Sequence, residues 1–589
     1  MATAAPNDRD RDLRSVQDAR TLARRAKDSA SRLAELSQAQ IDAIVDAVAA
    51  AATAQAEPFA RMAVDETGYG NVADKIQKNL FASDKIYRFI RPMKTVGIVA
   101  RHDDRRVIEI AEPFGVVAAI VPSTNPTSTA IYKILIALKA RCPVVISPHP
   151  SASRSITRVA EVLCEAACRA GAPEGSINWM TSVTLEGTGE LMKAREVALI
   201  LATGGMGLVR AAYSAGKPAY GVGPGNAPCF IERSANVAKA VDDIITGKTF
   251  DHGVLCSSPN SVVMEEAIAE EAKREFRARG GYFLSAAETD LLSRGLITAQ
   301  RLPNPKLVGK TAMQVAAACG ITAPEGTRVL IAELAGVGRD YPLSIEKLCP
   351  VLSSYVVRDW QEGCERSMQI LRYGGMGHTM SIHSENEKVI LEFGLRKPAF
   401  RISVNTPSTF GSIGLTTGLD PAMTLGCGGW GGNITSDNIT PRHLLNIKRL
   451  AWEIAPASKG AAPRAGSPPE VSMAAAKSAL GVGPAPVLPK TPARDEPAGI
   501  TSAALSSRID AFLASKGIEP PTPSTPATQP SRATQPSQPA PAEFVSEADV
   551  KEAIAQKRKI VLGEKTIVTP SARDLGEAAK VFVQASWKG

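Results

Sequence analysis

Short apolar runs rich in β-branched residues alternate with helical patterns along the first 454 residues, and this alternation constrains the fold most. The runs CPVVISP, VALILAT, APCFIE and RVLIAE each have the length of one strand, and SRSITRVAEVLCEAACRAG has helical spacing. Strand and helix in repeated order predict an α/β fold with a mostly parallel sheet. Helices are expected over 15–65, before the first strands, and a second α/β lobe is expected from about residue 250.

The composition changes sharply after residue 454. Stretches rich in Pro, Ala and Ser follow, and they contain too few apolar residues to form a core, so we interpret them as linkers. Two patterned segments interrupt them. One is an amphipathic helix expected near 500–516. The other is a small module over 545–589, which begins with a capping-box pattern from Ser546 to Asp549 and is expected to continue with a strand pair around LGEK.

Charge, cysteine spacing and hydropathy exclude several classes of protein. The formal net charge is +9, yet no block of five basic residues occurs, so nucleic-acid binding is not expected. The nine Cys and six His show no metal-ligand spacing, so no metal is expected. No apolar run reaches about 18 residues and no apolar signal core occurs near the start, so neither a membrane span nor secretion is expected. Unpaired cysteines suit the reducing cytoplasm.

The segment FDHGVLCSSPNSVV, residues 250–263, contains the strongest candidate nucleophile. Cys256 lies there between a glycine-containing turn and a β-branched strand. A thiol at such a junction can face a cleft and be activated by backbone dipoles. From this segment alone, a buried cysteine that only fills space remains the alternative.

A glycine-rich turn, TGGMG over 203–207, opens a helical pattern directly after the strand pattern VALILA. Such a turn allows backbone N–H groups and a helix N-terminus to approach a pyrophosphate. The turn lacks the GxGxxG spacing of the dinucleotide fingerprint, so by itself it is a weak signal.

Six motifs in order carry a resemblance to a known family. They are ATGGMGLVRAAYSAGKPAYGVGPGNAPCFIE, TFDHGVLCSSPNSVV, EKLCPVLSSYVVRD, RYGGMGHTMSIHS, VNTPSTFGSIG and PAMTLGCGGWGGNITSDNITPRHLLNIKRLAWE. Together they resemble the CoA-acylating aldehyde dehydrogenases of the aldehyde dehydrogenase superfamily, which include the propionaldehyde and acetaldehyde dehydrogenases of bacterial microcompartments. The resemblance covers about 95–455 closely and the N-terminal helices loosely.

The resemblance implies two α/β lobes with the active site between them and an oligomerisation hairpin. The strand pair within 107–121 and the segment after 434 are expected to form the hairpin region, so a dimer or tetramer is expected. The implied parts are N-terminal helices with a dinucleotide-binding domain (1–249, hairpin near 95–118), a catalytic domain (250–433), a core segment for oligomerisation (434–454), a linker (455–544) and the terminal module (545–589).

The resemblance also assigns roles to residues. Cys256 would attack the aldehyde, Asn125 would donate to the oxyanion, and His378 would act as base or positioning group for coenzyme A. Without the resemblance, Asn125 would be a turn residue and His378 a structural one. Cofactor contacts with NAD are implied for Ser147, Pro148, His149, Thr203, Gly204, Gly205, Gly223 and Glu346, with Glu346 accepting from the nicotinamide ribose.

One missing residue type bears on the reaction. Hydrolytic aldehyde dehydrogenases carry an ELGG segment whose Glu activates water, whereas the corresponding stretch here, GVGPGNAP over 221–228, contains no carboxylate. Without that base, water should attack the thioester slowly. The resemblance implies that the thiol of coenzyme A takes the acyl group instead.

The tail contains an apolar face that needs a partner. Leu505, Ile509, Phe512 and Leu513 fall on one face of the expected helix. A short helix between linkers has no core of its own, and this one resembles the encapsulation peptides that dock enzymes to microcompartment shell proteins. A marginal helix without a partner is the alternative. The module over 545–589 resembles a short module that recurs in microcompartment-associated proteins.

The sequence therefore predicts an NAD-dependent enzyme that converts propionaldehyde or acetaldehyde to its acyl-CoA, in the cytoplasm and within a microcompartment lumen. Three alternatives remain open. A sulfoacetaldehyde-type acylating enzyme would share the catalytic residues but need an anion site. A hydrolytic dehydrogenase would need a carboxylate base. A shell-binding scaffold would need only the tail.

Overall fold

The computed structural model describes residues 8–455, 542–568 and 572–584, apart from 574, 577 and 578. The chain divides into two compact units, Met1–Val471 and Ser472–Gly589. The helix expected near 500–516 lies outside the described residues. None of the described helices is both long enough and apolar enough to cross a membrane.

The first unit begins with helices, as the sequence predicts. They are α1 (Asp8–Ala34), α2 (Gln38–Ala54), α3 (Ala56–Thr67), α4 (Val72–Leu80) and α5 (Tyr87–Ile90), with a π-helical turn (Phe81–Ile86) before α5. Local caps define their starts: Ser37 and Gln40 form a capping box at α2, and Asn71 accepts the N–H of Asp74 at α4.

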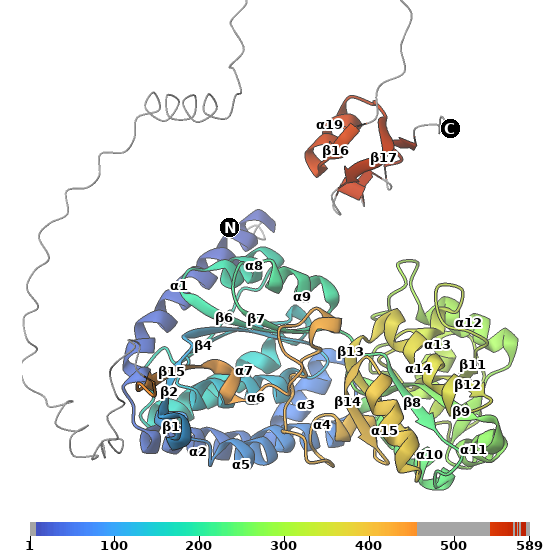
Figure 1. Ribbon diagram of the computed structural model, residues 1–589, viewed down its shortest axis with the longest axis horizontal. Coiled ribbons are helices and arrows are strands. Elements are labelled where there is room, and N and C mark those ends of the chain that lie inside the picture. The colour runs from blue at the N-terminus through green and yellow to red at the C-terminus, as the bar shows by residue number, and fades with distance from the viewer. Residues whose placement is uncertain (1–7, 456–541, 569–571, 574, 577–578, 585–589) are drawn as a thin grey trace, which may run out of the picture. The chain divides into compact units, whose positions relative to one another are not determined.

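A five-stranded parallel sheet forms the first lobe, in the order β5-β4-β3-β6-β7. Its strands are β3 (Val116–Val121), β4 (Val144–Pro148), β5 (Ile177–Trp179), β6 (Val197–Thr203) and β7 (Ala219–Val222). The connecting helices are α6 (Pro126–Lys139), α7 (Ser153–Arg169), α8 (Leu185–Lys193) and α9 (Met206–Tyr213). The expected α/β class is thereby confirmed (Figure 1).

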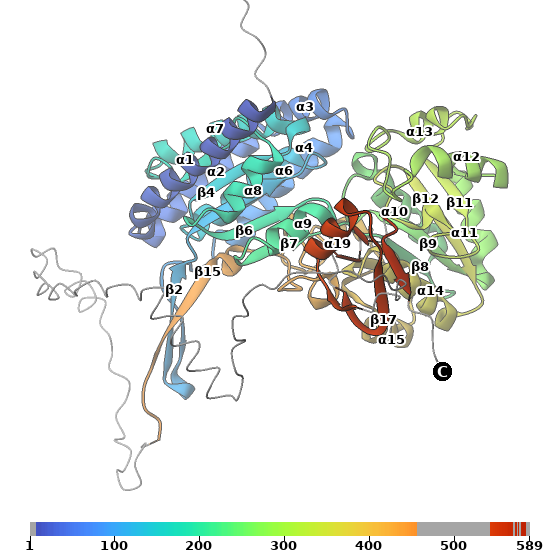
Figure 2. The ribbon, with the colours of Figure 1, turned by 90° about the horizontal axis from the view of Figure 1, so that it is seen from above.

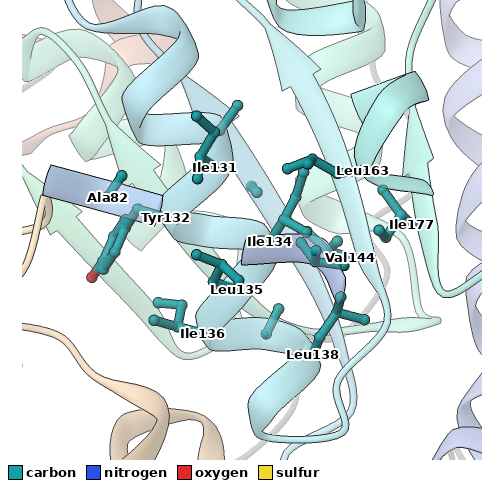
Figure 3. Close-up of a cluster of buried hydrophobic side chains, with 14 of the residues drawn as sticks. Ala82, Ile131, Tyr132, Ile134, Leu135, Ile136, Leu138, Val144, Leu163 and Ile177 are labelled. Carbon is teal, nitrogen blue, oxygen red and sulfur yellow. The ribbon is translucent and has the colours of Figure 1, made fainter. Parts of the chain in front are cut away.

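The core of this lobe surrounds α6, every residue of which is buried. A helix that is apolar on most sides needs neighbours on most sides. Figure 3 shows side chains of α6 among residues of α7, β4 and β5, including Ile134, Leu138, Leu163, Val144 and Ile177. The hydroxyl of Tyr132 donates to the Ile439 carbonyl at 2.6 Å, which satisfies the polar end of this buried ring.

A seven-stranded parallel sheet forms the second lobe, in the order β10-β11-β12-β9-β8-β13-β14. Its strands are β8 (Ala227–Ile231), β9 (Pro259–Glu265), β10 (Gly281–Phe283), β11 (Val329–Glu333), β12 (Val351–Val357), β13 (Gly377–His383) and β14 (Ala399–Val404). Its helices are α10 (Val237–Thr249), α11 (Glu266–Ala278), α12 (Ala286–Leu296), α13 (Ala312–Ala318), α14 (Trp360–Gly374), α15 (Glu387–Arg396) and α16 (Ser408–Gly411).

The chain passes from the first sheet to the second between Val222 and Ala227, whereas the sequence suggested a boundary at 249/250. Strand β8 causes the difference because it pairs with β9 and β13 in the second sheet. Its buried apolar pattern is the same as that of strands in the first sheet, so the pattern cannot tell which sheet it joins.

A separate antiparallel sheet contains β1 (Gly97–His102), β2 (Val107–Pro113) and β15 (Leu445–Ala451), with β2 in the middle. Figure 2 shows β2 and β15 running side by side away from the first lobe. The sequence predicted that the two strands within 107–121 pair with each other, and this is wrong. Strand β2 pairs with β1 and β15, and β3 lies in the centre of the five-stranded sheet.

The second unit contains β16 (Ala542–Val545), α19 (Glu547–Ala555), β17 (Ile560–Val568) and β18 (Phe582–Gln584). Its strands form a parallel sheet with β17 in the middle. Ser546 and Asp549 form the predicted capping box at α19. The strand pair expected around LGEK is not observed, because β17 continues through these residues as one strand.

Candidate active site

A cavity of about 510 Å³ lies between the two lobes. The first lobe contributes the ends of β3, β4 and β6 and the residues that follow β7, and the second lobe contributes Val254, Cys256, Glu346 and Leu348. Ligands of parallel α/β sheets bind beyond the carboxyl ends of the strands, and this cavity has that location.

All but one of the residues singled out from the sequence line this cavity. They are Asn125, Ser147, Pro148, His149, Thr203, Gly204, Gly205, Gly223, Cys256 and Glu346. Their roles remain predictions, but the structure brings them together from distant parts of the chain.

Cys256 lies in the turn between a 3₁₀ turn (Phe250–Gly253) and β9, and it is partly exposed. Burial raises the pKa of its thiol to about 12; Glu346 and Cys427 raise it further, and the Arg401 guanidinium lowers it. Without a bound ligand the sulfur is therefore held as the thiol. Cys427 is itself buried and is not among the residues that line the cavity.

Asn125 occupies the N-cap position of α6, with Pro126 following it. Asparagine at this position usually accepts a backbone N–H of its own helix. Here the side chain makes no such bond. Its Oδ1 accepts from the Lys78 ammonium at 2.7 Å, and its Nδ2 donates to the Thr124 hydroxyl at 3.2 Å.

Glu346 is buried and is the one carboxylate among the described residues that line the cavity. Its Oε1 accepts the backbone N–H of Gly225 at 3.0 Å. Burial raises its pKa to about 8, while that N–H and the ammonium groups of Lys248 and Lys347 act in the opposite direction. The group can therefore change its charge near neutral pH.

The wall formed by β6 and α9 fits a dinucleotide. Gly205 is the N-cap of α9, and no side chain caps this helix end. Within the described part of the chain, the buried Thr203 Oγ1 has no hydrogen-bond partner. Uncapped backbone N–H groups attract phosphate oxygens, and an unpartnered hydroxyl can donate to a ligand. Elsewhere in the cavity lining, the Ser147 and Thr188 hydroxyls bond to each other at 2.8 Å.

His378 is the singled-out residue that does not line the cavity. It lies buried on β13, and its Nδ1 is 2.9 Å from the Thr379 hydroxyl. No described residue bonds its Nε2. Burial, with a smaller effect of Arg401, lowers its pKa to about 3. A neutral ring with this pKa is a weak base, so in this state the geometry favours positioning over proton abstraction.

The sequence reasoning missed a group of buried charges beside Asn125. Lys75, Lys78 and Asp251 are almost fully buried, and both ammonium groups bond the Asp251 carboxylate. Asp251 and His252 have positive φ values of 47° and 53°, an unusual backbone conformation for residues other than glycine. No local pattern in the sequence indicates this group.

Comparison with known proteins agrees with this geometry. Residues 11–280 match the aldehyde dehydrogenase family. The structure is similar to that of an acetylating aldehyde dehydrogenase from Geobacillus thermoglucosidasius, with 49% identity, a TM-score of 0.75, and coverage of 76% of this chain and 99% of that one. The chain belongs to the aldehyde dehydrogenase family. The resemblance to its CoA-acylating members is confirmed by this match.

Two more relatives of this chain are informative. The bifunctional aldehyde-alcohol dehydrogenase of Escherichia coli is 40% identical over 441 residues, which are 74% of this chain and 49% of that protein. The chain thus spans about half the length of this curated relative. A propionaldehyde dehydrogenase from the fucose utilisation microcompartment of Clostridium phytofermentans is 27% identical, with a TM-score of 0.66 and coverage of 74% and 98%.

Proposed function

We propose that this protein oxidises a short aliphatic aldehyde, propionaldehyde or acetaldehyde, to its acyl-CoA with NAD as co-substrate. The observation that carries the proposal is that Cys256 and Asn125 line one cavity with Thr203, Gly205 and Glu346. A nucleophile, an oxyanion donor and a dinucleotide wall in one cavity are the parts that this reaction needs.

In this proposal the Cys256 thiol loses its proton to solvent, the resulting thiolate attacks the aldehyde carbon, and the carbonyl oxygen becomes an oxyanion. The Asn125 side-chain amide stabilises that oxyanion, a contribution of roughly 100- to 1,000-fold in rate for one such donor. A bound nicotinamide would supply the hydride acceptor, and loss of the hydride would leave the acyl group on Cys256 as a thioester. Thr203 and Gly205 would hold the pyrophosphate side of the dinucleotide, and Glu346 would accept a hydrogen bond from its ribose.

The acyl acceptor we propose is the thiol of coenzyme A, whose sulfur attacks the thioester while its proton passes to the departing Cys256 sulfur, so that the Cys256 thiol is restored. Residues 221–228 contain no carboxylate. A water molecule near the thioester would therefore lack the base that hydrolytic aldehyde dehydrogenases carry in this segment.

The composition of the cavity supports an uncharged substrate. Among the described residues that line it, none is Lys or Arg. A sulfonate group, as in sulfoacetaldehyde, would need a cationic partner when it is withdrawn from water. An aliphatic aldehyde needs only the apolar surface that residues such as Val254 and Leu348 provide.

The test is NADH formation by the full chain with a panel of aldehydes, with and without coenzyme A, followed by mass spectrometry of the products. We expect turnover that depends on coenzyme A and yields acyl-CoA, with propionaldehyde and acetaldehyde preferred to sulfoacetaldehyde. Mainly free acid at saturating coenzyme A would contradict the acyl-transfer step. The same assay with NADP tests the cofactor preference.

We also propose that the enzyme works as a homo-oligomer inside a bacterial microcompartment. The three-stranded sheet of β1, β2 and β15 supports the oligomer, because Ile98 and Leu450 on its outer strands are 40% and 47% exposed. The apolar face that the sequence predicts for residues 505–513 and the microcompartment origin of the Clostridium phytofermentans relative support the location. The partner would be a shell protein.

A further inference from the structure

Helix α4 carries two buried lysines beside the oxyanion donor. Lys75 and Lys78 are one helical turn apart and have 1% and 3% of their side-chain surface exposed. Both bond Oδ2 of Asp251, which is fully buried, and the Lys75 distance is 2.9 Å. Two cations around one carboxylate are costly to bury, and such a cluster persists when its remaining hydrogen bonds are also satisfied.

The bond that Lys78 makes to Asn125 sets the orientation of the amide. An ammonium group has three donors and no acceptor, so only the oxygen of an amide can face it. The Lys78 Nζ lies 2.7 Å from Asn125 Oδ1, which leaves Nδ2 on the other side of the side chain. Asn125 lines the cavity and makes no cap with its own helix. Its other bond, from Nδ2 to the Thr124 hydroxyl at 3.2 Å, does not fix the amide, because a hydroxyl can donate as well as accept.

Asp251 connects this arrangement to the loop that carries the nucleophile. Its Oδ1 accepts the N–H of Asn71 at 2.9 Å, and its own N–H donates to Asp74 at 2.6 Å. The start of α4 therefore holds both the backbone and the side chain of Asp251, in the turn just before Cys256.

We propose that Lys78 is a positioning residue, which fixes the Asn125 amide with its N–H₂ group as the donor in the cavity, and that Asp251 holds Lys78 in place. This inference rests on the proposed function, since it assigns Asn125 to the oxyanion. Without Lys78 the amide can rotate by half a turn and present its oxygen, which repels an oxyanion.

The decisive experiment is a double-mutant cycle of Lys78→Met and Asn125→Ala in the full chain. We expect Lys78→Met to lower kcat about 10- to 100-fold, which is part of the full effect of the Asn125 donor. The KM values for aldehyde and NAD should stay within about threefold of the wild-type values. In the Asn125→Ala background the same change should lower kcat less than about threefold, because no amide remains to be oriented. Equal losses in both backgrounds would overturn the proposal.

Lys75→Met is the matched control. Lys75 bonds the same carboxylate but reaches only the Thr124 carbonyl, at 3.4 Å, and not the Asn125 side chain. We expect a similar fall in Tm for the two methionine variants but a much smaller fall in kcat for Lys75→Met. A loss of kcat equal to that of Lys78→Met would mean that the cluster acts only on stability, and the proposal would fail.

A comparison of Asn125→Asp with Asn125→Ala tests the contact even if Lys78→Met does not fold. In Asn125→Asp the new carboxylate should form an ion pair with Lys78, so the Tm of this variant should exceed the Tm of Asn125→Ala. The kcat of Asn125→Asp should fall at least ~100-fold below that of the wild type, because a carboxylate cannot donate a hydrogen bond. A Tm for Asn125→Asp below that of Asn125→Ala overturns the proposal, since no cation would then face residue 125. A wild-type enzyme without aldehyde-dependent activity would instead refute the proposed function.

Discussion

Gly225 passes so close to Cys256 that a Cβ on Gly225 would lie 2.2 Å from the Cys256 carbonyl oxygen. The same Cβ would lie 2.9 Å from Nδ1 of His378. The backbone at 225 thus fills the space between the Cys256 peptide and the His378 ring. Because any side chain is excluded there, position 225 cannot hold a carboxylate.

Gly225→Ala should therefore displace the Cys256 backbone and lower kcat at least ~10-fold, with a fall in Tm, because overpacking a tight site costs about 1–3 kcal/mol. Activity assays and thermal melts of the purified variant measure both effects. Gly189→Ala on α8 is the matched control, since a Cβ there meets no atom within 4 Å. Wild-type kcat in Gly225→Ala would show that the contact does not constrain Cys256.

The pKa of Cys256 gives a prediction for its reactivity. With a pKa of about 12, only about 1 in 10,000 thiols is ionised at pH 8. Alkylation of Cys256 by iodoacetamide in the free enzyme should therefore be slow and should rise steadily between about pH 7 and pH 10. The alkylation rate of a short cysteine peptide, whose thiol has a pKa of about 8.5, should level off in this range. Mass spectrometry of the Cys256 peptide measures the rate.

A plateau below about pH 9 would mean that the protein stabilises the Cys256 thiolate even without ligands. Cys256→Ala serves as the functional control. It should abolish aldehyde-dependent NADH formation and retain NAD binding, because Thr203, Gly205 and Glu346 are unchanged.

The fold class and most of the cavity could be predicted from the sequence for a physical reason. Parallel strands buried on both faces are continuous apolar runs, and the segments that follow them collect at one edge of the sheet. Asn125 follows β3, His149 follows β4 and Gly204 follows β6, so their proximity in the cavity follows from the alternation itself.

Contacts between distant segments could not be predicted in this way. Lys78 and Asp251 are 173 positions apart, and the charged pattern of α4 is the same as that of a solvated helix. The partners of β8 and β2 depend on which sheet each strand joins, and a buried strand carries no signal for that choice. Glu346 next to Lys347 has the sequence of an exposed ion pair, yet both side chains are buried and bond other groups.

Glu346→Gln should weaken NAD binding and stabilise the fold. Above about pH 8, where Glu346 is ionised, loss of this charged acceptor should raise the KM for NAD about 10-fold or more. The folded-state pKa of Glu346, about 8, lies above its ordinary value of 4.5, so the folded state binds more protons between these values and loses stability as the pH rises. The glutamine variant avoids this loss.

The Tm of Glu346→Gln should therefore exceed that of the wild type by a margin that grows from about pH 5 to pH 8 and is constant above that. Thermal melts across this range measure it. Glu288→Gln, at an exposed helix start far from the cavity, is a control for the method: the pKa of this carboxyl is lowered by the Ser285 N–H and hydroxyl, so its loss should destabilise the fold at neutral pH. If the Tm difference between Glu346→Gln and the wild type becomes smaller as the pH rises, the raised pKa of Glu346 is contradicted.

The tail should target the protein to microcompartments and contribute nothing to turnover. The residues of the first unit that line the cavity end at Leu348, and the three-stranded sheet ends at Ala451, so deletion of 456–589 should leave kcat within about twofold of wild type. Residues 498–518 fused to a fluorescent protein should enter microcompartments in a host that makes them. Fluorescence microscopy and fractionation of the compartments measure the recruitment.

The apolar face that the sequence predicts for residues 505–513 should provide the docking energy of the tail. Burial of Ile509 and Phe512 against a shell protein would contribute roughly 1.5–3 kcal/mol for each side chain, before the cost of ordering the helix. One copy should therefore bind weakly, and an oligomer that presents several copies should bind more strongly because of its effective concentration. Replacing both residues with Asp should spread the signal of the fusion through the cytoplasm, whereas Ser506→Asp and Ser507→Asp on the polar side should not. If the fusion of 498–518 stays diffuse while a fusion of 545–589 is recruited, the terminal module is the targeting segment.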